Sequence, residues 1–521
     1  MNIEGLRDVL RRVNENAIHV VIISHYGILK HGFIRLDPFF LDSIKILLEV
    51  IALTNNLTEL AVEQLAPLIQ NQTISPVELT QAVLEHAEKT QEHVNAYMNM
   101  YRDEALQSAK QAENEIRSGQ YRGMYHGIPM GIKDNIFFKN LRTTMSSKIH
   151  KDFIPTFDAT VTEKLREAGV IFTGKLSMHE YAMGITNNNP HYGPVHNPWN
   201  VSKVSGGSSG GSGAAVAVGS SVASIGTDTA GSIRIPSALC GIVGLKPTRG
   251  RVSTHGVFPL SWTMDHVGPM TKTVKDAAGL LEIITGYDEK DPASANVPTG
   301  KVLDGITGDV KDLVIGINED FFFHNIDAGI EKLVRENIQK LVDQGARVEE
   351  VEIPAMKDAE WAGFSFSLSE ASTYHYVNTL DRPEDFGDDI RGLITSGASP
   401  SSDEYRRALI ARAEAQKDFE EIFKKVDVLI SPTTPVMPST IGNDVVDLNG
   451  EDVDFMMNII RLTGPGNLTG LPSLSVPCGL HNGMPVGLQI MGPAFREDLV
   501  LNTGYAIEKT NPLQGNKPSI S

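Results

Sequence analysis

Glycine and small hydroxyl residues dominate residues 206–236, and this composition constrains the fold more than any other feature of the chain. The segment begins with the run Gly206-Gly-Ser-Ser-Gly-Gly-Ser-Gly-Ala-Ala-Val-Ala and ends with the run Gly226-Thr-Asp-Thr-Ala-Gly-Ser-Ile-Arg-Ile-Pro. Because glycine lacks a side chain, neighbouring segments can pack backbone against backbone at these positions. The segment therefore predicts a tightly packed core in which backbone N–H groups can reach a reacting centre.

Short apolar runs elsewhere predict an α/β fold. Residues 170–173, 221–226 and 242–245 are candidate buried strands. After about residue 300, strands and helices alternate, with strands expected at 313–318, 348–353 and 426–431 and a helix at 328–344. Such alternation is typical of a β-sheet covered by helices.

The N-terminal residues carry no chemical motif. Apolar residues recur at helical spacing between Ile44 and Ile51, which predicts amphipathic helices that pack on the protein rather than on a membrane. Farther on, Ser75 and Glu78 form a capping box, which predicts a helix that continues to about Glu88. We expect residues 1–55 to form a helical extension to one large domain.

The overall composition excludes several classes of function. Lys and Arg number 46 and Asp and Glu number 64, which gives a formal charge of −18 and disfavours binding to a phosphate backbone. The two cysteines and the fifteen histidines lack metal-ligand spacing, so neither a metal nor another cofactor is expected. Neither a signal-peptide pattern nor an uncharged apolar window of about 18 residues is found, which predicts a cytoplasmic enzyme.

Ser232 is a candidate nucleophile. It follows the glycine-containing turn 228–231 and precedes a short predicted helix, a position where free N–H groups favour negative charge. If Ser232 attacks a carbonyl group, the amides of Thr229, Ala230, Gly231 and Ser232 itself can hold the oxyanion. The structural alternative is that Ser232 only caps the helix.

Lys133 is a candidate base. It ends the apolar run Gly127-Ile-Pro-Met-Gly-Ile, which predicts a buried strand, where a charged lysine is costly. Burial lowers the pKa of a lysine and makes the neutral amine available as a base. The alternative is a structural salt bridge to the adjacent Asp134 or to another carboxylate.

The loop that contains Ser208 and Ser209 is ambiguous when taken alone. Its sequence fits the Gly-x-Ser-x-Gly elbow of α/β-hydrolases, but that elbow needs a buried strand directly before it. Residues 197–205 are polar and interrupted by a proline, which disfavours the elbow. A phosphate-binding loop is disfavoured too, since no Gly-Lys-Ser/Thr follows.

Taken together, the three segments resemble the amidase signature family. The matching patterns are Gly-Ile-Pro-x-x-x-Lys-Asp, Gly-Gly-Ser-Ser-Gly-Gly-Ser and Gly-Thr-Asp-x-x-Gly-Ser-Ile-Arg-x-Pro, and further matches are Asn197-Pro-Trp-Asn, Gly244-Leu-Lys-Pro-Thr, Ser431-Pro-Thr-Thr-Pro and Pro485-Val-Gly-Leu-Gln-Ile-Met-Gly. The resemblance extends from about Leu57 to about Asn511. It implies a catalytic domain over residues 56–515, with a large mixed, twisted sheet and helices on both faces.

The resemblance also implies a role for each site residue. Ser232 corresponds to the acyl-forming nucleophile, Ser208 to a bridging serine after a cis peptide bond, and Lys133 to the neutral base. The oxyanion hole corresponds to Thr229, Ala230, Gly231 and Ser232, and the supporting residues to Ser209, Asp228 and Arg234. Position 230 departs from the family pattern, where glycine is frequent.

The implied reaction is hydrolysis of a carboxylic amide to an acid and ammonia or an amine, through an acyl-enzyme. The expected partner is a small-molecule amide, with no nucleic acid and no membrane, and a homodimer is left open. Segments 183–192, 321–323, 361–376 and 459–467 are candidate walls of the substrate pocket.

The alternative within the family is the glutaminase component, or A subunit, of a tRNA-dependent amidotransferase. That component usually carries a Tyr-Tyr-x-x-x-Pro-Ala-Glu-Ala-Ser segment, of which this chain has only Glu370-Ala371-Ser372.

Overall fold

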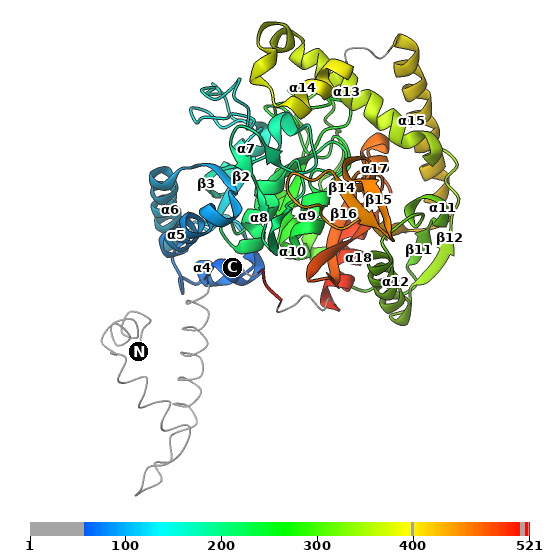
Figure 1. Ribbon diagram of the computed structural model, residues 1–521. Helices are drawn as coiled ribbons and strands as arrows, with labels where there is room; N and C mark the ends of the chain where they lie inside the picture. Colours follow the sequence, from blue (N-terminus) through cyan, green and yellow to red (C-terminus); the bar gives the residue numbers. More distant parts are fainter. Residues whose placement is uncertain (1–56, 398–400, 511–515, 519, 521) are drawn as a thin grey trace, which may run out of the picture. The chain divides into compact units, whose positions relative to one another are not determined.

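An eleven-stranded mixed sheet runs through the protein in the computed structural model, which describes residues 57–397, 401–510, 516–518 and 520 (Figure 1). The predicted helical extension over residues 1–55 lies outside the described residues. In spatial order the strands are β1 (Tyr97–Met100), β3 (Ile171–Leu176), β2 (Pro129–Lys133), β8 (Ser224–Asp228), β10 (His266–Thr271), β9 (Val243–Lys246), β16 (Ser473–His481), β17 (Met484–Met491), β13 (Val428–Pro432), β11 (Val314–Ile317) and β12 (Arg347–Glu350).

Parallel pairs lie on either side of a central block of antiparallel pairs, and the edge strand β1 is antiparallel to β3. β2 is parallel to both β3 and β8, and β11 is parallel to both β12 and β13. Parallel neighbours need a crossover connection. Helix α7 (Thr160–Glu167) lies in the connection from β2 to β3, and helix α12 (Ala328–Asp343) in that from β11 to β12.

Helices cover both faces of the sheet, as strand β16 shows. Alternate residues of a strand point to opposite faces. Leu474 packs against Gly504 of α18 (Glu497–Lys509), whereas the next residue, Ser475, lies on the side of α9 (Arg234–Cys240). Helix α8 (Gly210–Val218) packs beside α9, and α10 (Val274–Ile284) and α12 pack beside α18. The predicted α/β class, with helices on both faces of a mixed sheet, is confirmed.

The glycine-rich segment forms α8, β8 and α9. A side chain at Gly206, whose φ is +80°, would lie 2.9 Å from the Cα of Pro236, and one at Gly213 would lie 3.1 Å from the Pro236 carbonyl oxygen. The two helices therefore meet backbone against backbone, as the composition predicts.

Local signals predicted individual elements well. Ser75 Oγ accepts the Glu78 N–H at 3.0 Å, and the Glu78 carboxylate accepts the Ser75 N–H at 2.9 Å. The resulting helix α5 (Pro76–Val94) continues past the predicted end at Glu88.

Helices α13 (Met356–Asp381), α14 (Asp388–Gly397) and α15 (Ser402–Ile422) lie at the top and upper right of the molecule in Figure 1. Helix α13 packs against the other two and against α17 (Gly464–Thr469). The remaining elements are α4 (Val62–Gln70), α6 (Arg102–Arg117), α11 (Glu319–Phe322), α16 (Phe455–Ile459), β4 (Asn188–Asn189), β5 (Gly193–Pro194), β6 (His196–Asn197), β7 (Asn200–Val204), β14 (Val445–Leu448), β15 (Glu451–Asp454) and four 3₁₀ turns, Leu57–Glu59, Glu180–Ala182, Leu303–Gly305 and Pro383–Asp385. Over the described part of the chain, no helix combines the length and the apolar character that crossing a bilayer requires.

Candidate active site

Lys133 is the last residue of strand β2, and its side chain is fully buried. Because β2 and β8 are parallel neighbours, their carboxyl ends lie at the same edge of the sheet. Lys133 Nζ lies 2.7 Å from Thr227 Oγ1 of β8 and 2.8 Å from Ser208 Oγ. The structural alternative does not occur: Asp134 accepts hydrogen bonds from Thr144 and Ser146 instead, and no carboxylate of the described residues forms an ion pair with Lys133.

Burial makes the neutral amine of Lys133 available as a base. Loss of water around the amine lowers the pKa of Lys133 from 10.5 to about 7, although the charges of Asp228 and Asp265 partly oppose this shift. The neutral amine is therefore substantially populated near neutral pH.

The loop before α8 holds Ser208 and Ser209. The Gly207–Ser208 peptide bond is cis, the conformation that the family resemblance implied. Ser209 Oγ donates to the Thr227 carbonyl at 3.1 Å, and the Ser209 N–H donates to the Ser232 carbonyl at 3.3 Å. These contacts hold the loop against Thr227 and against Ser232.

Ser232 lies two residues before the start of α9 and does not cap this helix. The N-cap residue is Ile233, and it is Asp228 Oδ2 that accepts the N–H groups of Ile233 and Arg234, at 3.1 and 3.4 Å. The Ser232 hydroxyl makes no hydrogen bond with the described residues, although the side chain is only 6% exposed. Ser232 is thus a buried hydroxyl that opens onto a cavity rather than a structural cap.

The turn 229–232 presents backbone donors beside that hydroxyl. The Gly231 N–H donates to Asp228 Oδ1 at 2.7 Å and is therefore occupied. Within the described structure, the N–H groups of Thr229, Ala230 and Ser232 have no hydrogen-bond acceptor. Gly231 has φ of +131°, and a side chain there would meet Thr463 Oγ1 at 2.3 Å, so glycine is required.

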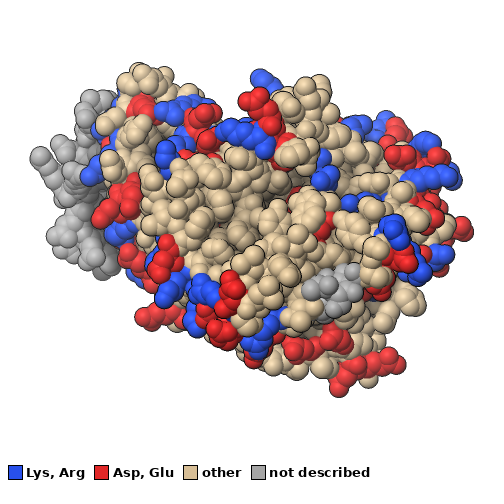
Figure 2. Space-filling model, turned by 90° about the horizontal axis from the view of Figure 1, so that it is seen from above, with Lys and Arg blue, Asp and Glu red and all other residues tan. Residues whose placement is uncertain are grey.

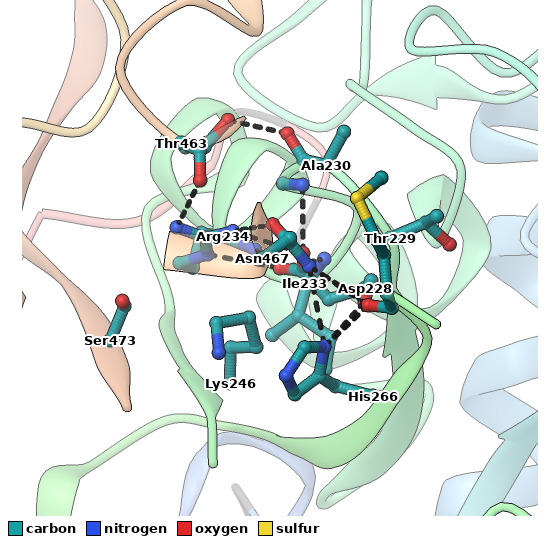
Figure 3. Close-up of polar contacts among 12 residues, drawn as sticks. Asp228, Thr229, Ala230, Ile233, Arg234, Lys246, His266, Thr463, Asn467 and Ser473 are labelled. Carbon is teal, nitrogen blue, oxygen red and sulfur yellow. Dashed lines mark hydrogen bonds and ion pairs between the residues drawn. The ribbon is translucent and has the colours of Figure 1, made fainter. Parts of the chain in front are cut away.

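A buried ion pair organises the turn from beneath (Figure 3). Arg234 Nε and Nη2 donate to the two carboxylate oxygens of Asp228 at 3.0 Å each. The other N–H groups of Arg234 donate to Thr463, Gln489 and Asn467, which uses all five donors of the guanidinium. The adjacent Arg234 charge holds the pKa of Asp228 well below its usual range, against the opposing effect of burial.

Several residues of this arrangement were not singled out from the sequence. Asn467 donates to the carbonyl and the carboxylate of Asp228 at 2.9 and 2.8 Å (Figure 3). Asp265 accepts a hydrogen bond of 2.6 Å from Thr229 Oγ1, and burial raises the pKa of Asp265 to about 6. Thr227, the second hydrogen-bond partner of Lys133, directly precedes Asp228. Its place in the Gly-Thr-Asp motif is the sequence signal that could have identified it.

A cavity of about 100 Å³ lies beside Ser232. Three of the four predicted wall segments contribute to it: 183–192, 361–376 and 459–467. Residues 321–323 do not line the cavity, but the Phe321 carbonyl accepts a hydrogen bond from Arg461, which does. Figure 2, seen from above the view of Figure 1, shows a hollow within an area of uncharged residues, with charged residues toward its rim. No group of three or more His, Cys, Asp or Glu side chains in the described residues could hold a metal ion.

The fold and this arrangement agree with the comparisons to known proteins. The family model "Amidase" matches residues 78–501, and the chain belongs to this family, the amidase signature enzymes. It is accordingly a hydrolase that acts on the carbon–nitrogen bonds of amides.

Individual relatives narrow the comparison further. The chain is 38% identical over 484 residues to the A subunit of glutamyl-tRNA(Gln) amidotransferase from Geobacillus kaustophilus, covering 88% of this chain and 99% of the relative. The crystal structure of the protein of the same name from Thermotoga maritima is 33% identical, with a TM-score of 0.77, covering 89% and 99% of the two chains. A structure described as revealing the evolutionary origins of an s-triazine catabolic enzyme is 28% identical, with a TM-score of 0.84, covering 89% and 100%.

These relatives correct one prediction. The expectation of a small-molecule amide as partner, with no nucleic acid, was wrong, because the relatives are named as one component of an enzyme for glutamyl-tRNA. The prediction used the net charge of −18, which describes only the average surface of this chain. It says nothing of a nucleic acid that binds elsewhere in a larger assembly.

Proposed function

We propose that this chain is the A subunit of a tRNA-dependent amidotransferase, in which it hydrolyses the side-chain amide of glutamine and supplies ammonia to partner subunits. The carrying observation is the buried Lys133 amine, 2.8 Å from the Ser208 hydroxyl, in a structure whose Ser232 lines a cavity. We assign this activity to residues 56–515 and to the cytoplasm.

The proposed reaction begins at Ser232. Its oxygen attacks the amide carbon while its proton passes to Ser208, and the Ser208 proton passes to the neutral Lys133 amine. The same path returns a proton to the leaving nitrogen, the carbon–nitrogen bond breaks, and ammonia departs. Water then attacks the acyl ester of Ser232 by the same proton path, and this step releases the acid and restores the serine.

The turn 229–232 provides the proposed oxyanion hole. We assign the unoccupied donors of this turn, the N–H groups of Thr229, Ala230 and Ser232, to the developing negative charge. Thr229 and Gly231 hold the turn through Asp265 and Asp228, respectively. Asp228, Arg234 and Ser209 keep these groups in position and take no part in proton transfer.

The choice of glutamine and of a multisubunit enzyme is supported by the relatives. The match covers 99% of the Geobacillus kaustophilus relative, so it is not confined to the catalytic motifs. The cavity of about 100 Å³ suits a small acyl group.

Glutamine hydrolysis, measured with and without the partner subunits, tests this proposal. We expect ammonia release that increases on assembly, and transfer to glutamyl-tRNA only in the assembled enzyme. A fluorophosphonate probe should label Ser232 in the wild type and not in Ser232→Ala. Failure to hydrolyse glutamine in either form, with full probe labelling, would refute the glutaminase assignment and leave the amidase assignment intact.

A further inference from the structure

Two charged residues interrupt an otherwise largely apolar cavity beside Ser232. Most of its lining consists of Ala, Met, Ile, Leu, Phe and Gly side chains. The exceptions that carry charge are Glu360, from α13, and Arg461, which lies between α16 and α17. A charge at an apolar surface is costly unless a partner compensates it, so each residue calls for an explanation.

Glu360 faces the cavity as part of one stripe of α13. Residues Glu360, Gly363, Phe364 and Ser367 recur at the spacing of a single helical face, and all line the cavity. Glu360 is half-buried, and no hydrogen bond or ion pair joins its carboxylate to another described residue. Burial raises the pKa of Glu360, and the positive charge of Arg461 opposes this shift.

Arg461 is fixed in position without a carboxylate partner. Its Nη1 donates to the Phe321 carbonyl at 2.7 Å, and its Nη2 donates to the carbonyls of His324 and Asn325 at 2.7 and 3.0 Å. A guanidinium has five N–H donors, so two remain for a ligand. In the described residues no Asp or Glu lies within ion-pair distance of Arg461, so its charge is oriented but not neutralised.

We infer that Glu360 and Arg461 determine specificity, binding the ammonium and the carboxylate of an amino-acid amide whose side-chain amide reaches Ser232. This inference rests on the proposed function and adds the residues that select the substrate. Two opposite charges on one small cavity, separated beyond ion-pair distance, match a zwitterion better than a neutral or singly charged acyl group. A neutral amide of the same length would desolvate both charges and compensate neither.

Four amides of matched length test the inference by binding. L-Glutamine carries both charges, 4-aminobutanamide only the ammonium, 5-amino-5-oxopentanoate only the carboxylate, and butanamide neither. Binding is measured by calorimetry on the full chain, assembled with its partner subunits, in a Ser232→Ala background that prevents turnover. We expect the order glutamine, then the singly charged amides, then butanamide.

Variants assign each charge to its residue. Glu360→Gln should weaken binding of the two ammonium-bearing amides by about 10- to 100-fold relative to the other two. Arg461→Met should do the same for the two carboxylate-bearing amides. Arg461→Lys keeps the positive charge but loses the planar guanidinium group. This variant replaces Arg461→Met if the latter fails to fold. Asp358→Asn, an exposed acidic position on the same helix, is the matched control and should change nothing.

Binding and turnover separate the two proposals. Equal weakening of all four amides by Glu360→Gln, or no weakening, would overturn the inference, even if the wild type hydrolyses glutamine well. Charge-selective loss of binding in both variants would support the inference. This holds even if the assembled wild type fails to release ammonia from glutamine, because that failure refutes only the proposed reaction.

Discussion

The hydroxyl of Thr463 donates a hydrogen bond of 2.6 Å to the carbonyl of Ala230, across 233 positions of the chain. This contact fixes the peptide plane between Ala230 and Gly231. The N–H groups that remain without acceptors then lie on a turn held from both sides, by Thr463 above and by Asp228 beneath. Such a turn can stabilise an oxyanion without reorganising during the reaction.

Gly231→Ala should destabilise the protein and impair catalysis. The φ of +131° disfavours any side chain, and the added methyl would lie 2.3 Å from Thr463 Oγ1. We expect a loss of about 1–3 kcal/mol in the free energy of unfolding, measured by denaturant titration, with a lower kcat. Ala230→Gly, the adjacent matched change, should leave kcat within a few-fold of wild type. Equal behaviour of the two variants would contradict this account of the turn.

Removal of the reacting groups should abolish activity without unfolding the protein. Ser232→Ala should prevent acyl-enzyme formation, and Lys133→Met or Ser208→Ala should lower kcat by about 10²- to 10⁴-fold through loss of proton transfer. Ser212→Ala, in the same glycine-rich segment, is the control and should remain active. Amide turnover, with circular dichroism as the test of folding, gives the answer. Near-wild-type turnover in Ser232→Ala or Lys133→Met would refute their assigned roles.

The pH dependence of kcat/KM should follow Lys133. Only the neutral amine acts as the base, so the rate should rise with pH through the Lys133 pKa of about 7 and level off above it. The negative charge of Asp265 raises this pKa, so Asp265→Asn should move the midpoint of the rise to lower pH. Asp452→Asn, at an exposed position on β15, should leave the midpoint in place. A midpoint that moves upward in Asp265→Asn would contradict this assignment.

Arg234→Met should be among the most destabilising single changes. It leaves the fully buried Asp228 carboxylate without its cation and removes donors to Thr463, Gln489 and Asn467. We expect a loss of about 3–5 kcal/mol in the free energy of unfolding by denaturant titration. Arg496→Met removes an exposed ion pair with Asp498 and should cost no more than about 1 kcal/mol. Similar losses for both arginines would show that burial does not decide the effect.

The sequence predicted features that local chemistry determines. The capping box of α5 depends on two residues three positions apart, and the buried strand that ends at Lys133 is visible as an apolar run. The assignment of Ser208, Ser232 and Lys133 used motifs whose residue types are rare in combination. That assignment stays a prediction until turnover is measured, although the structure places the Lys133 amine beside Ser208.

The remaining features depend on contacts between distant parts of the chain. Asn467 and Thr463 reach the active-site turn through contacts with Asp228 and Ala230, more than 230 positions earlier in the chain, and neither residue type is unusual in a sequence. The order of the eleven strands places β8 beside β10 and β9 beside β16, and these pairings join separate parts of the chain that no local pattern connects. The failed prediction of partners has a similar cause, since whole-chain charge averages over surfaces that contact different molecules.

Helix α13 supplies much of the cavity wall, whereas the proposed nucleophile and base stand on or beside the central sheet. Much of the cavity wall and the proposed reacting groups therefore belong to separate layers of the molecule. Mutations along the inner stripe of α13 can accumulate without disturbing the lysine or the serines, so new amide preferences are accessible by modest changes in one helix. A library randomised at Gly363, Phe364 and Ser367 is the direct way to exploit this separation.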